Sequence, residues 1–195
     1  MKKWIIPLVL VIVAIFWGMG VNNTAVELEE NISNSWGNVE SAYQRRNDLI
    51  GNLVKTVQGA AEFEKGTLTE VIQARAKATS VNIDANNLTP ESIAAFQGAQ
   101  NGLTGALSKL LVSVERYPEL KANQNFLELQ SQLEGTENRI NIARDRFNEQ
   151  VKPYNTYVRQ FPTKLVASML GFEEKAYYQS DEGSEKAPDV EFNFD

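Results

Sequence analysis

Four charged residues fall on the apolar stripes of the helices that the sequence predicts. At about 100° per residue, Arg46 and Glu64 lie on the stripe of the first predicted helix, and Glu137 and Arg144 lie near the stripe centre of the third. Two cations and two anions are therefore directed at the core, where an unpaired charge is costly. The pattern has two interpretations: a polar binding or relay site inside the bundle, or ion pairs that fix the register between helices.

Register is the favoured interpretation of these four charges, because the sequence has no histidine and no glycine-rich phosphate loop near them. A count of helical turns, made with the first and third helices parallel, gives specific partners. It predicts that Arg144 lies nearer Glu64 and that Arg46 lies beside the turn containing Glu115 and Glu119.

Composition narrows the chemistry further. The 195 residues include no cysteine and no histidine, which excludes thiol nucleophiles, disulfides, Cys/His zinc sites and imidazole proton shuttles. We therefore expect no enzymatic activity, no cofactor and no metal.

The net charge is −6, which argues against binding to the phosphate backbone of a nucleic acid. With 43% apolar residues, the chain has enough material for a core.

Residues 4–21 form an uncharged apolar run that predicts a transmembrane anchor. Lys2 and Lys3 precede the run, and no further Lys or Arg occurs before Arg45. The positive-inside rule then places residues 1–3 in the cytoplasm and the remainder of this single-pass protein outside it. A cleaved signal peptide is the competing interpretation, although Gly18-x-Gly20 is a poor cleavage site.

Apolar residues repeat at helical spacing through residues 24–172, which we expect to form one helical bundle domain. The first helix is predicted to run over 24–79, with a possible kink at Gly51. The second starts at the Thr89-Pro90 cap and ends at Pro118.

The third predicted helix begins at Asn123 and breaks or kinks at Pro153, and a short helix follows Pro162. The pattern indicates an all-α, antiparallel up-and-down bundle; a long single coiled coil is the alternative. Residues 173–195 form an acidic tail, whose last residues alternate in polarity and could dock.

Three blocks of the sequence resemble the LemA family of bacterial membrane-anchored proteins. They are "QRRNDLIGNLVKTVQGAAEFEKGTLTEVIQARAKA" (44–78), "ERYPELKANQNFLELQSQLEGTENRINIARDRFNEQVKPYN" (115–155) and "QFPTKLVASMLGFEEKAYYQ" (160–179). The resemblance implies an N-terminal membrane segment followed by an elongated four-helix bundle, and it implies no established enzymatic activity. This chain has Gly51 where the family usually has proline and Phe63 where it usually has histidine. The "PDVEF" near the end also resembles the family and favours a docked tail.

Two functions are compatible with these features. The first is a membrane-tethered, extracytoplasmic scaffold or adaptor that binds a protein partner or self-associates. The second is an enzyme or small-ligand-binding bundle that uses the in-bundle carboxylates and arginines.

Overall fold

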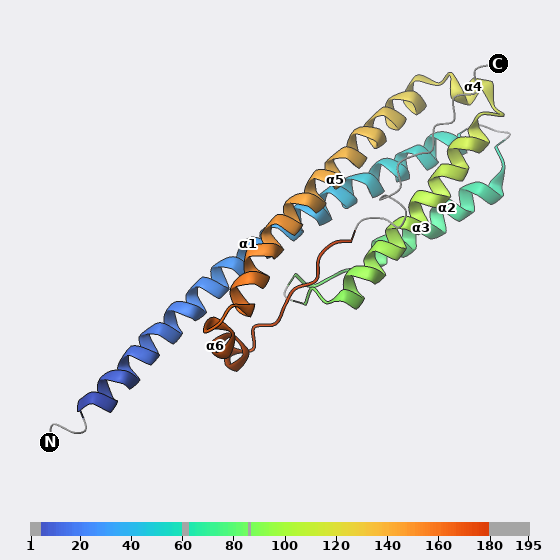
Figure 1. Cartoon of the computed structure of the whole chain (residues 1–195). Helices are drawn as coiled ribbons and strands as arrows, with labels where there is room; N and C mark the ends of the chain where they lie inside the picture. Colours follow the sequence, from blue (N-terminus) through green and yellow to red (C-terminus); the bar gives the residue numbers. More distant parts are fainter. Residues whose placement is uncertain (1–4, 60–62, 86, 180–195) are drawn as a thin grey trace, which may run out of the picture.

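The computed structural model describes residues 5–59, 63–85 and 87–179, and this part of the chain is all-α, as predicted (Figure 1). No β-strand occurs among these residues. Six helices follow one another along the chain: α1 (Ile5–Gln58), α2 (Lys65–Ser80), α3 (Pro90–Val114), α4 (Pro118–Lys121), α5 (Gln124–Arg159) and α6 (Thr163–Leu170).

The predicted anchor and the first bundle helix form one uninterrupted helix, α1, of 54 residues. At ~1.5 Å per residue it is ~80 Å long. Its apolar first part projects beyond the other helices and is exposed (Figure 1). Among the described residues, α1 is the one helix long and apolar enough to cross a membrane. The predicted positions of residues 1–3 lie outside the described part of the chain.

The prediction of one helix over 24–79 is wrong, because α1 ends at Gln58 and α2 runs back beside it. The apolar stripe continues across the reversal, so spacing alone does not reveal it. Folding back lets Leu68 and Val71 of α2 enter the same apolar cluster as Leu53 of α1 and Leu103 of α3. In one straight helix, the apolar residues after position 58 would extend beyond these partners and bury less apolar surface.

The two residues considered as kink or break points both lie inside continuous helices. Helix α1 passes through Gly51 unbroken, and a Cβ built there would lie 3.2 Å from the guanidinium carbon of Arg75. The missing side chain thus leaves room for Arg75, whose Nε donates to the Asn47 carbonyl at 2.7 Å. Helix α5 continues past Pro153, against the predicted break. Pro153 is on the exposed side of α5, where water can satisfy the carbonyl that loses its N–H partner.

The predicted starts of the second and third bundle helices are confirmed. Thr89 and Ser92 form a reciprocal capping box at the start of α3, with Pro90 in its first turn. The Asn123 side chain accepts the Phe126 N–H at 3.2 Å at the start of α5.

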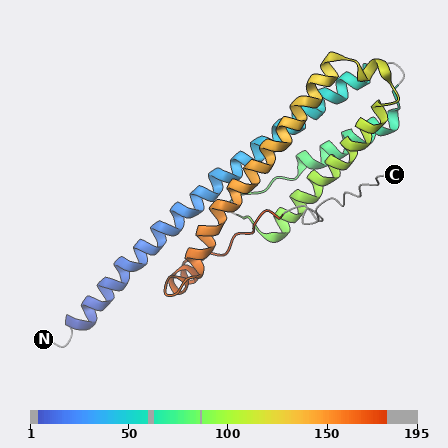
Figure 2. The same cartoon turned by 45° about the horizontal axis from the view of Figure 1, so that its top comes forward.

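The helices pack mainly as two pairs, α1 along α5 and α2 along α3, with further contact between α1 and α2 (Figure 2). Helix α1 ends where α5 begins, so the two are antiparallel (Figure 1). The core has two clusters. An aromatic cluster centres on Trp36, whose ring meets those of Phe96 and Phe147 edge-on at 5.4 and 5.3 Å. A mainly aliphatic cluster fills the end of the bundle where α1 ends and α5 begins, away from the projecting part of α1.

Residues 173–179, which we call the strap, leave α6 and run in an irregular path back to α3 (Figure 1). Asn155 donates to the Lys175 carbonyl and accepts its N–H, at 2.8 and 2.9 Å. Asn148 makes the same two bonds with Tyr178, both at 2.9 Å. The Ala176 N–H donates to the Leu88 carbonyl at 3.0 Å. The strap thus joins α5 to the start of α3; the predicted docking of the last residues of the tail lies outside the described residues.

Candidate functional site

Arg46 lies in the core, only 3% exposed, and its guanidinium joins three helices. Nη1 lies 3.3 Å from Glu137 Oε2 of α5 and 3.2 Å from Thr104 Oγ1 of α3. Nη2 donates to Gln100 Oε1 at 2.6 Å, and the guanidinium carbon lies 4.9 Å from the ring centre of Tyr43. The prediction that Arg46 faces the bundle is confirmed.

The arrangement of charge around Arg46 is asymmetric. Gln100 is 1% exposed, whereas the Glu137 side chain is 46% exposed. The positive charge is therefore buried, while its carboxylate partner stays half in water. Arg46 Nε is buried without a hydrogen-bond partner among the described residues. The hydrogen bonds of its two Nη atoms therefore fix the position of α1 relative to α3 and α5.

The predicted partners of these charges are wrong in detail, because α1 and α5 are antiparallel rather than parallel. Arg46 pairs with Glu137 and not with Glu115 or Glu119. Glu115 pairs instead with Lys121. The four candidate residues therefore do not form one network.

The remaining two candidates lie apart from each other. Glu64 is at the far end of the molecule, 3.0 Å from Arg116, and both side chains are more than half exposed. A surface pair of this kind contributes little to stability. Arg144 contacts a pair of tyrosines instead.

The Arg144 guanidinium lies against Tyr43 and Tyr178. Its Nε donates to the Tyr43 hydroxyl at 2.9 Å, and its guanidinium carbon lies 4.4 Å from the ring centre of Tyr178. The two tyrosine hydroxyls lie 2.6 Å apart. Burial of Tyr178, together with the adjacent Tyr43, raises the pKa of its hydroxyl well above the usual value, and Arg144 opposes this in part. Tyr43 thus lies beside both core arginines and joins the strap to α1.

The two arginine sites in the core, around Arg46 and Arg144, together form what we call the polar core. Its members Tyr43, Tyr178 and Gln100 were not identified from the sequence. Tyr43 is on the apolar stripe of α1, but a stripe position says nothing about where a phenolic hydroxyl finds its partner. Gln100, a polar residue on the stripe of the second bundle helix, was the available signal, because a buried amide needs hydrogen-bond partners.

A second, partly buried polar contact joins the strap to α1 near the apolar end. Lys175 Nζ lies 2.6 Å from Glu29 Oε1, with the side chains 10% and 28% exposed. The Tyr154 hydroxyl donates to the Glu173 carbonyl at 2.9 Å. Burial, assisted by the negative charges of Glu29 and Glu173, raises the pKa of Tyr154 from 10.0 to about 12.

This raised pKa predicts a specific alkaline destabilisation. The folded chain keeps the Tyr154 proton up to a pH of about 12, whereas the unfolded chain releases it near 10. The stabilising contribution is therefore complete below pH 10 and is lost as the pH rises from 10 to 12. We expect a Tyr154→Phe variant, measured by denaturant unfolding across this range, to lose less stability than the parent. The Tyr177→Phe substitution in the strap is the matched control, and equal slopes for the parent and Tyr154→Phe would contradict the assignment.

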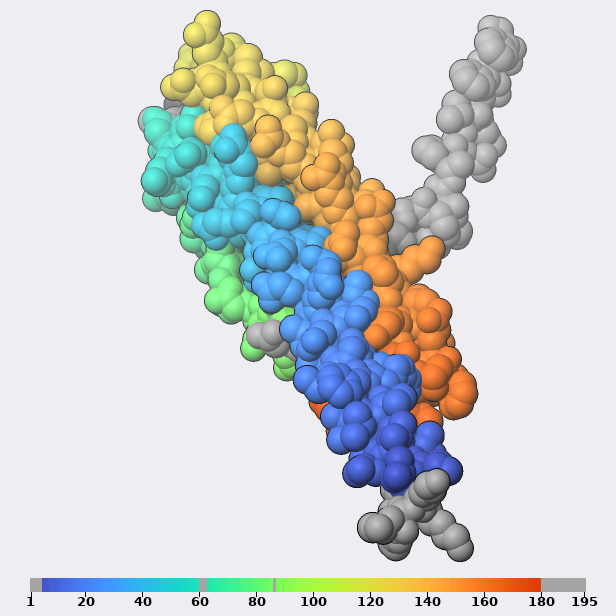
Figure 3. Space-filling view, turned by 90° about the vertical axis from the view of Figure 1, so that its left-hand side faces the viewer, coloured from blue at the N-terminus to red at the C-terminus, as the bar shows by residue number. Residues whose placement is uncertain are grey.

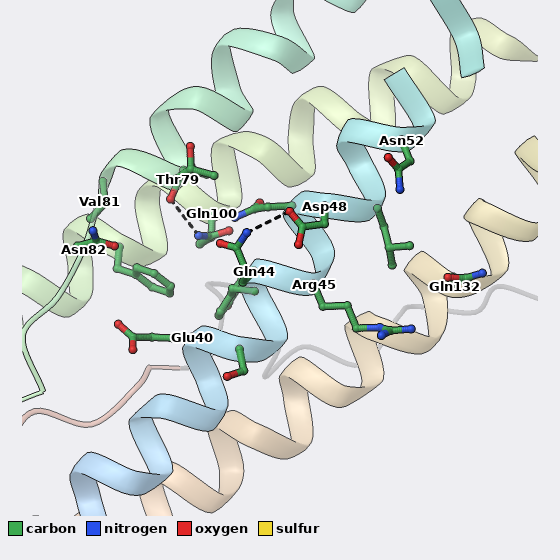
Figure 4. A pocket seen from close by; sticks show the side chains of 16 residues that line it. Glu40, Gln44, Arg45, Asp48, Asn52, Thr79, Val81, Asn82, Gln100 and Gln132 are labelled. Carbon is green, nitrogen blue, oxygen red and sulfur yellow. Dashed lines mark hydrogen bonds between the residues drawn. The ribbon is translucent and has the colours of Figure 1, made fainter. Parts of the chain in front are cut away.

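An open groove of about 710 Å³ lies beside Arg46 and its partner Gln100, and Figure 4 shows the polar lining of the groove. Gln44 donates to Asp48 at 3.0 Å along α1, and Asp48 lies 4.0 Å from Arg75. Asn47, also in the lining, is 3% exposed, and its side-chain oxygen has no partner among the described residues. The labelled residues come from several elements: Glu40, Gln44, Arg45, Asp48 and Asn52 from α1, Thr79 from α2, Val81 and Asn82 from the following loop, Gln100 from α3 and Gln132 from α5.

The groove offers amides, hydroxyls and carboxylates rather than a catalytic constellation. No group of three or more His, Cys, Asp or Glu residues suited to a metal ion occurs among the described residues. Chemically, this lining can exchange hydrogen bonds with a polar molecule or with the surface of another protein.

Comparison with known proteins gives a consistent result. A sequence model of the LemA family matches residues 35–192. Magnetosome protein MamQ 2 of Paramagnetospirillum magneticum is 26% identical, with 80% of this chain and 64% of the relative covered. Protein LemA of Metamycoplasma hominis is 25% identical, with 84% of this chain and 71% of the relative covered. The chain thus spans 64% of the length of the magnetosome relatives.

Proposed function

Because the chain belongs to the LemA family, we propose that it is a membrane-anchored, extracytoplasmic helical scaffold that binds a protein partner or a second copy of itself and catalyses no reaction. One observation carries the proposal: α1 continues without a break from the apolar N-terminal segment into the core. An unbroken helix transmits the position of an anchor directly to the bundle, as a rigid scaffold requires and a flexible tether does not.

The shape and the polar core support a scaffold role. In this proposal the long helices α1, α2, α3 and α5 form one elongated, antiparallel up-and-down bundle. The Arg46 contacts to Glu137 and Gln100 hold its register, and the strap closes it on one side. The outward-facing groove then presents a polar docking surface at a fixed height above the membrane.

The orientation follows from the charges that flank residues 4–21. Lys2 and Lys3 lie before this segment, and the charges that first follow it are the acidic residues Glu27, Glu29 and Glu30. The positive-inside rule retains the lysines in the cytoplasm and exports the bundle. Residues 4–21 then serve as a single-pass, uncleaved anchor.

One experiment tests both the orientation and the binding role. Since the chain has no cysteine, Gln44→Cys at the groove and Ser108→Cys on the outer side of α3 each give a unique thiol. Intact cells are treated with a membrane-impermeant maleimide that carries a photoreactive group, and then illuminated. We expect both sites to react and the Gln44 site to give a discrete cross-linked product. Reaction only after permeabilisation would overturn the orientation, and reaction without any product at either site would overturn the scaffold.

A small-ligand-binding bundle is the second candidate. The Asn47 side-chain oxygen beside the groove, which has no hydrogen-bond partner within the described part of the chain, favours it. That oxygen is buried, so a polar ligand with an N–H or O–H donor would satisfy it by displacing the side chains that cover it. An Asn47→Leu variant separates the two candidates, because it should abolish binding of such a ligand and leave the cross-linked product from the Gln44 site intact.

A further inference from the structure

The turn before α6 and the outer side of α6 expose an unusual amount of apolar surface. Phe161 is 82% exposed and Met169 is 86% exposed. Leu165 and Leu170 are 59% and 49% exposed. We call these four residues the α6 patch. Four large apolar side chains so close in the chain are costly to hold in water and indicate an interaction surface.

Helix α6 is amphipathic, so the exposure is not a sign of loose packing. Ala167, on its inner side, is 1% exposed and belongs to the aromatic cluster of the core. Leu165 and Met169 are one turn apart and project from the opposite side. The helix ends in a left-handed Gly171, whose N–H bonds the Ser168 carbonyl at 3.3 Å. The patch is therefore presented by a well-formed and firmly packed helix.

The position of α6 identifies what could cover the patch. Helix α6 packs against α1 at the end of the bundle from which the apolar part of α1 projects, as both cartoons show (Figures 1 and 2). Figure 3 shows the dark-blue start of α1 extending past the orange end of the bundle. The first buried residues of α1 are Val21 and Ala25, so the bundle starts where the predicted span ends.

The dimensions of the span bring this end of the bundle to the lipid surface. A helical span of 18 residues, the length of segment 4–21, would rise ~27 Å, whereas a bilayer has a hydrocarbon core of ~30 Å and polar interfaces of several ångströms on each side. A span this short leaves no spacer between the hydrocarbon and Val21. With this segment in the bilayer, α6 would lie at the depth of the head groups and the first acyl carbons.

We propose that the α6 patch inserts into the lipid interface as a second membrane contact beside the transmembrane part of α1. This inference rests on the proposed membrane anchoring. Among the charges near the patch, Lys164 is exposed and can direct its amine to the head groups, Arg159 is paired with Glu174 at 3.4 Å, and Glu173 is exposed three residues after Leu170. Two contacts, one through the bilayer and one on its surface, stop the bundle from turning about α1 and fix the side on which the groove faces.

The test uses the full chain in phosphatidylcholine vesicles, with an environment-sensitive fluorophore on a single introduced cysteine. Met169→Cys reports on the α6 patch and Phe16→Cys on the span, and Val112→Cys, 72% exposed near the far end of α3, is the matched apolar control. Lipids carrying a shallow nitroxide quencher are then added. We expect quenching at the Met169 site comparable with that at the Phe16 site and several-fold greater than at the Val112 site.

Each outcome has one meaning. Quenching at the Phe16 site without quenching at the Met169 site overturns this inference and leaves the anchor intact. Absence of quenching at both sites overturns the anchor itself. A blue-shifted but unquenched fluorophore at the Met169 site indicates that a second copy of the protein covers the patch, which also overturns the lipid contact. As a further check, Phe161→Ser together with Leu165→Ser should reduce quenching at the Met169 site and leave that at the Phe16 site unchanged.

Discussion

Replacing Arg46 by alanine is expected to lower the free energy of unfolding by about 2–4 kcal/mol. Removing one partner from a fully buried ion pair typically costs ~3–5 kcal/mol. Glu137 is 46% exposed and can be rehydrated, which reduces the loss. Gln100, however, is 1% exposed and would lose the donor that its side-chain oxygen accepts at 2.6 Å. The Tyr43 ring would also lose the guanidinium packed over it.

Thermal and denaturant unfolding of the full chain in detergent, followed by circular dichroism, measures this loss. Arg45→Ala is the matched control, because Arg45 is the exposed neighbour on α1 and its removal should change stability by no more than ~0.5 kcal/mol. An unchanged melting temperature for Arg46→Ala would show that Arg46 does not hold the register.

A third variant separates charge from packing. Arg46→Met keeps much of the side-chain volume and removes the charge together with Nε, which has no hydrogen-bond partner among residues 5–59, 63–85 and 87–179. Arg46→Met leaves Gln100 and Glu137 without their donor, as Arg46→Ala does, but it fills the cavity that alanine would leave, so we expect Arg46→Met to be more stable than Arg46→Ala. If the two are equally unstable, the polar contacts rather than the filled volume provide the stabilisation.

The helical class, the membrane-type segment and the helix starts could be predicted because each has a local cause. The Thr89-Pro90 and Asn123 caps act within one turn of their own positions, and the stripe through Trp36 and Tyr43 follows from helical periodicity alone. The reversal after Gln58 has no such local signal, since the apolar spacing is the same on both sides of it.

The partners of the charged residues could not be predicted, because they depend on the relative direction of two helices. The direction of Arg46 toward the core follows from the stripe, but its pairing with the half-exposed Glu137 requires α1 and α5 to be antiparallel. Arg144 likewise faces inward as expected, yet its contact with Tyr178 depends on a strap without periodicity. Irregular segments are held by individual hydrogen bonds, which sequence patterns do not encode.

Releasing the strap is expected to give the second large effect. In the double variant Asn148→Ala and Asn155→Ala, four hydrogen bonds to the backbone of Lys175 and Tyr178 are lost. At ~1 kcal/mol net for each bond the upper limit is ~4 kcal/mol. The strap can detach locally before the bundle unfolds. The loss in the free energy of global unfolding therefore cannot exceed the free energy with which the strap docks on the bundle, and we expect a loss of about 2–3 kcal/mol.

Hydrogen exchange locates this effect. We expect faster exchange at the Ala176 amide, which donates to Leu88, together with retained protection in the centres of α1 and α5. Asn141→Ala, an exposed asparagine on the same helix, is the control and should alter neither exchange nor stability. Unchanged exchange at Ala176 in the double variant would mean that the buried ring of Tyr178 and the Lys175–Glu29 pair hold the strap without the asparagines. Because the strap carries Tyr178 to Arg144 and Tyr43, its release should also expose these two residues to water. If the Tyr178 ring and the asparagines hold the strap together, a Tyr178→Ala variant should give the same faster exchange at Ala176.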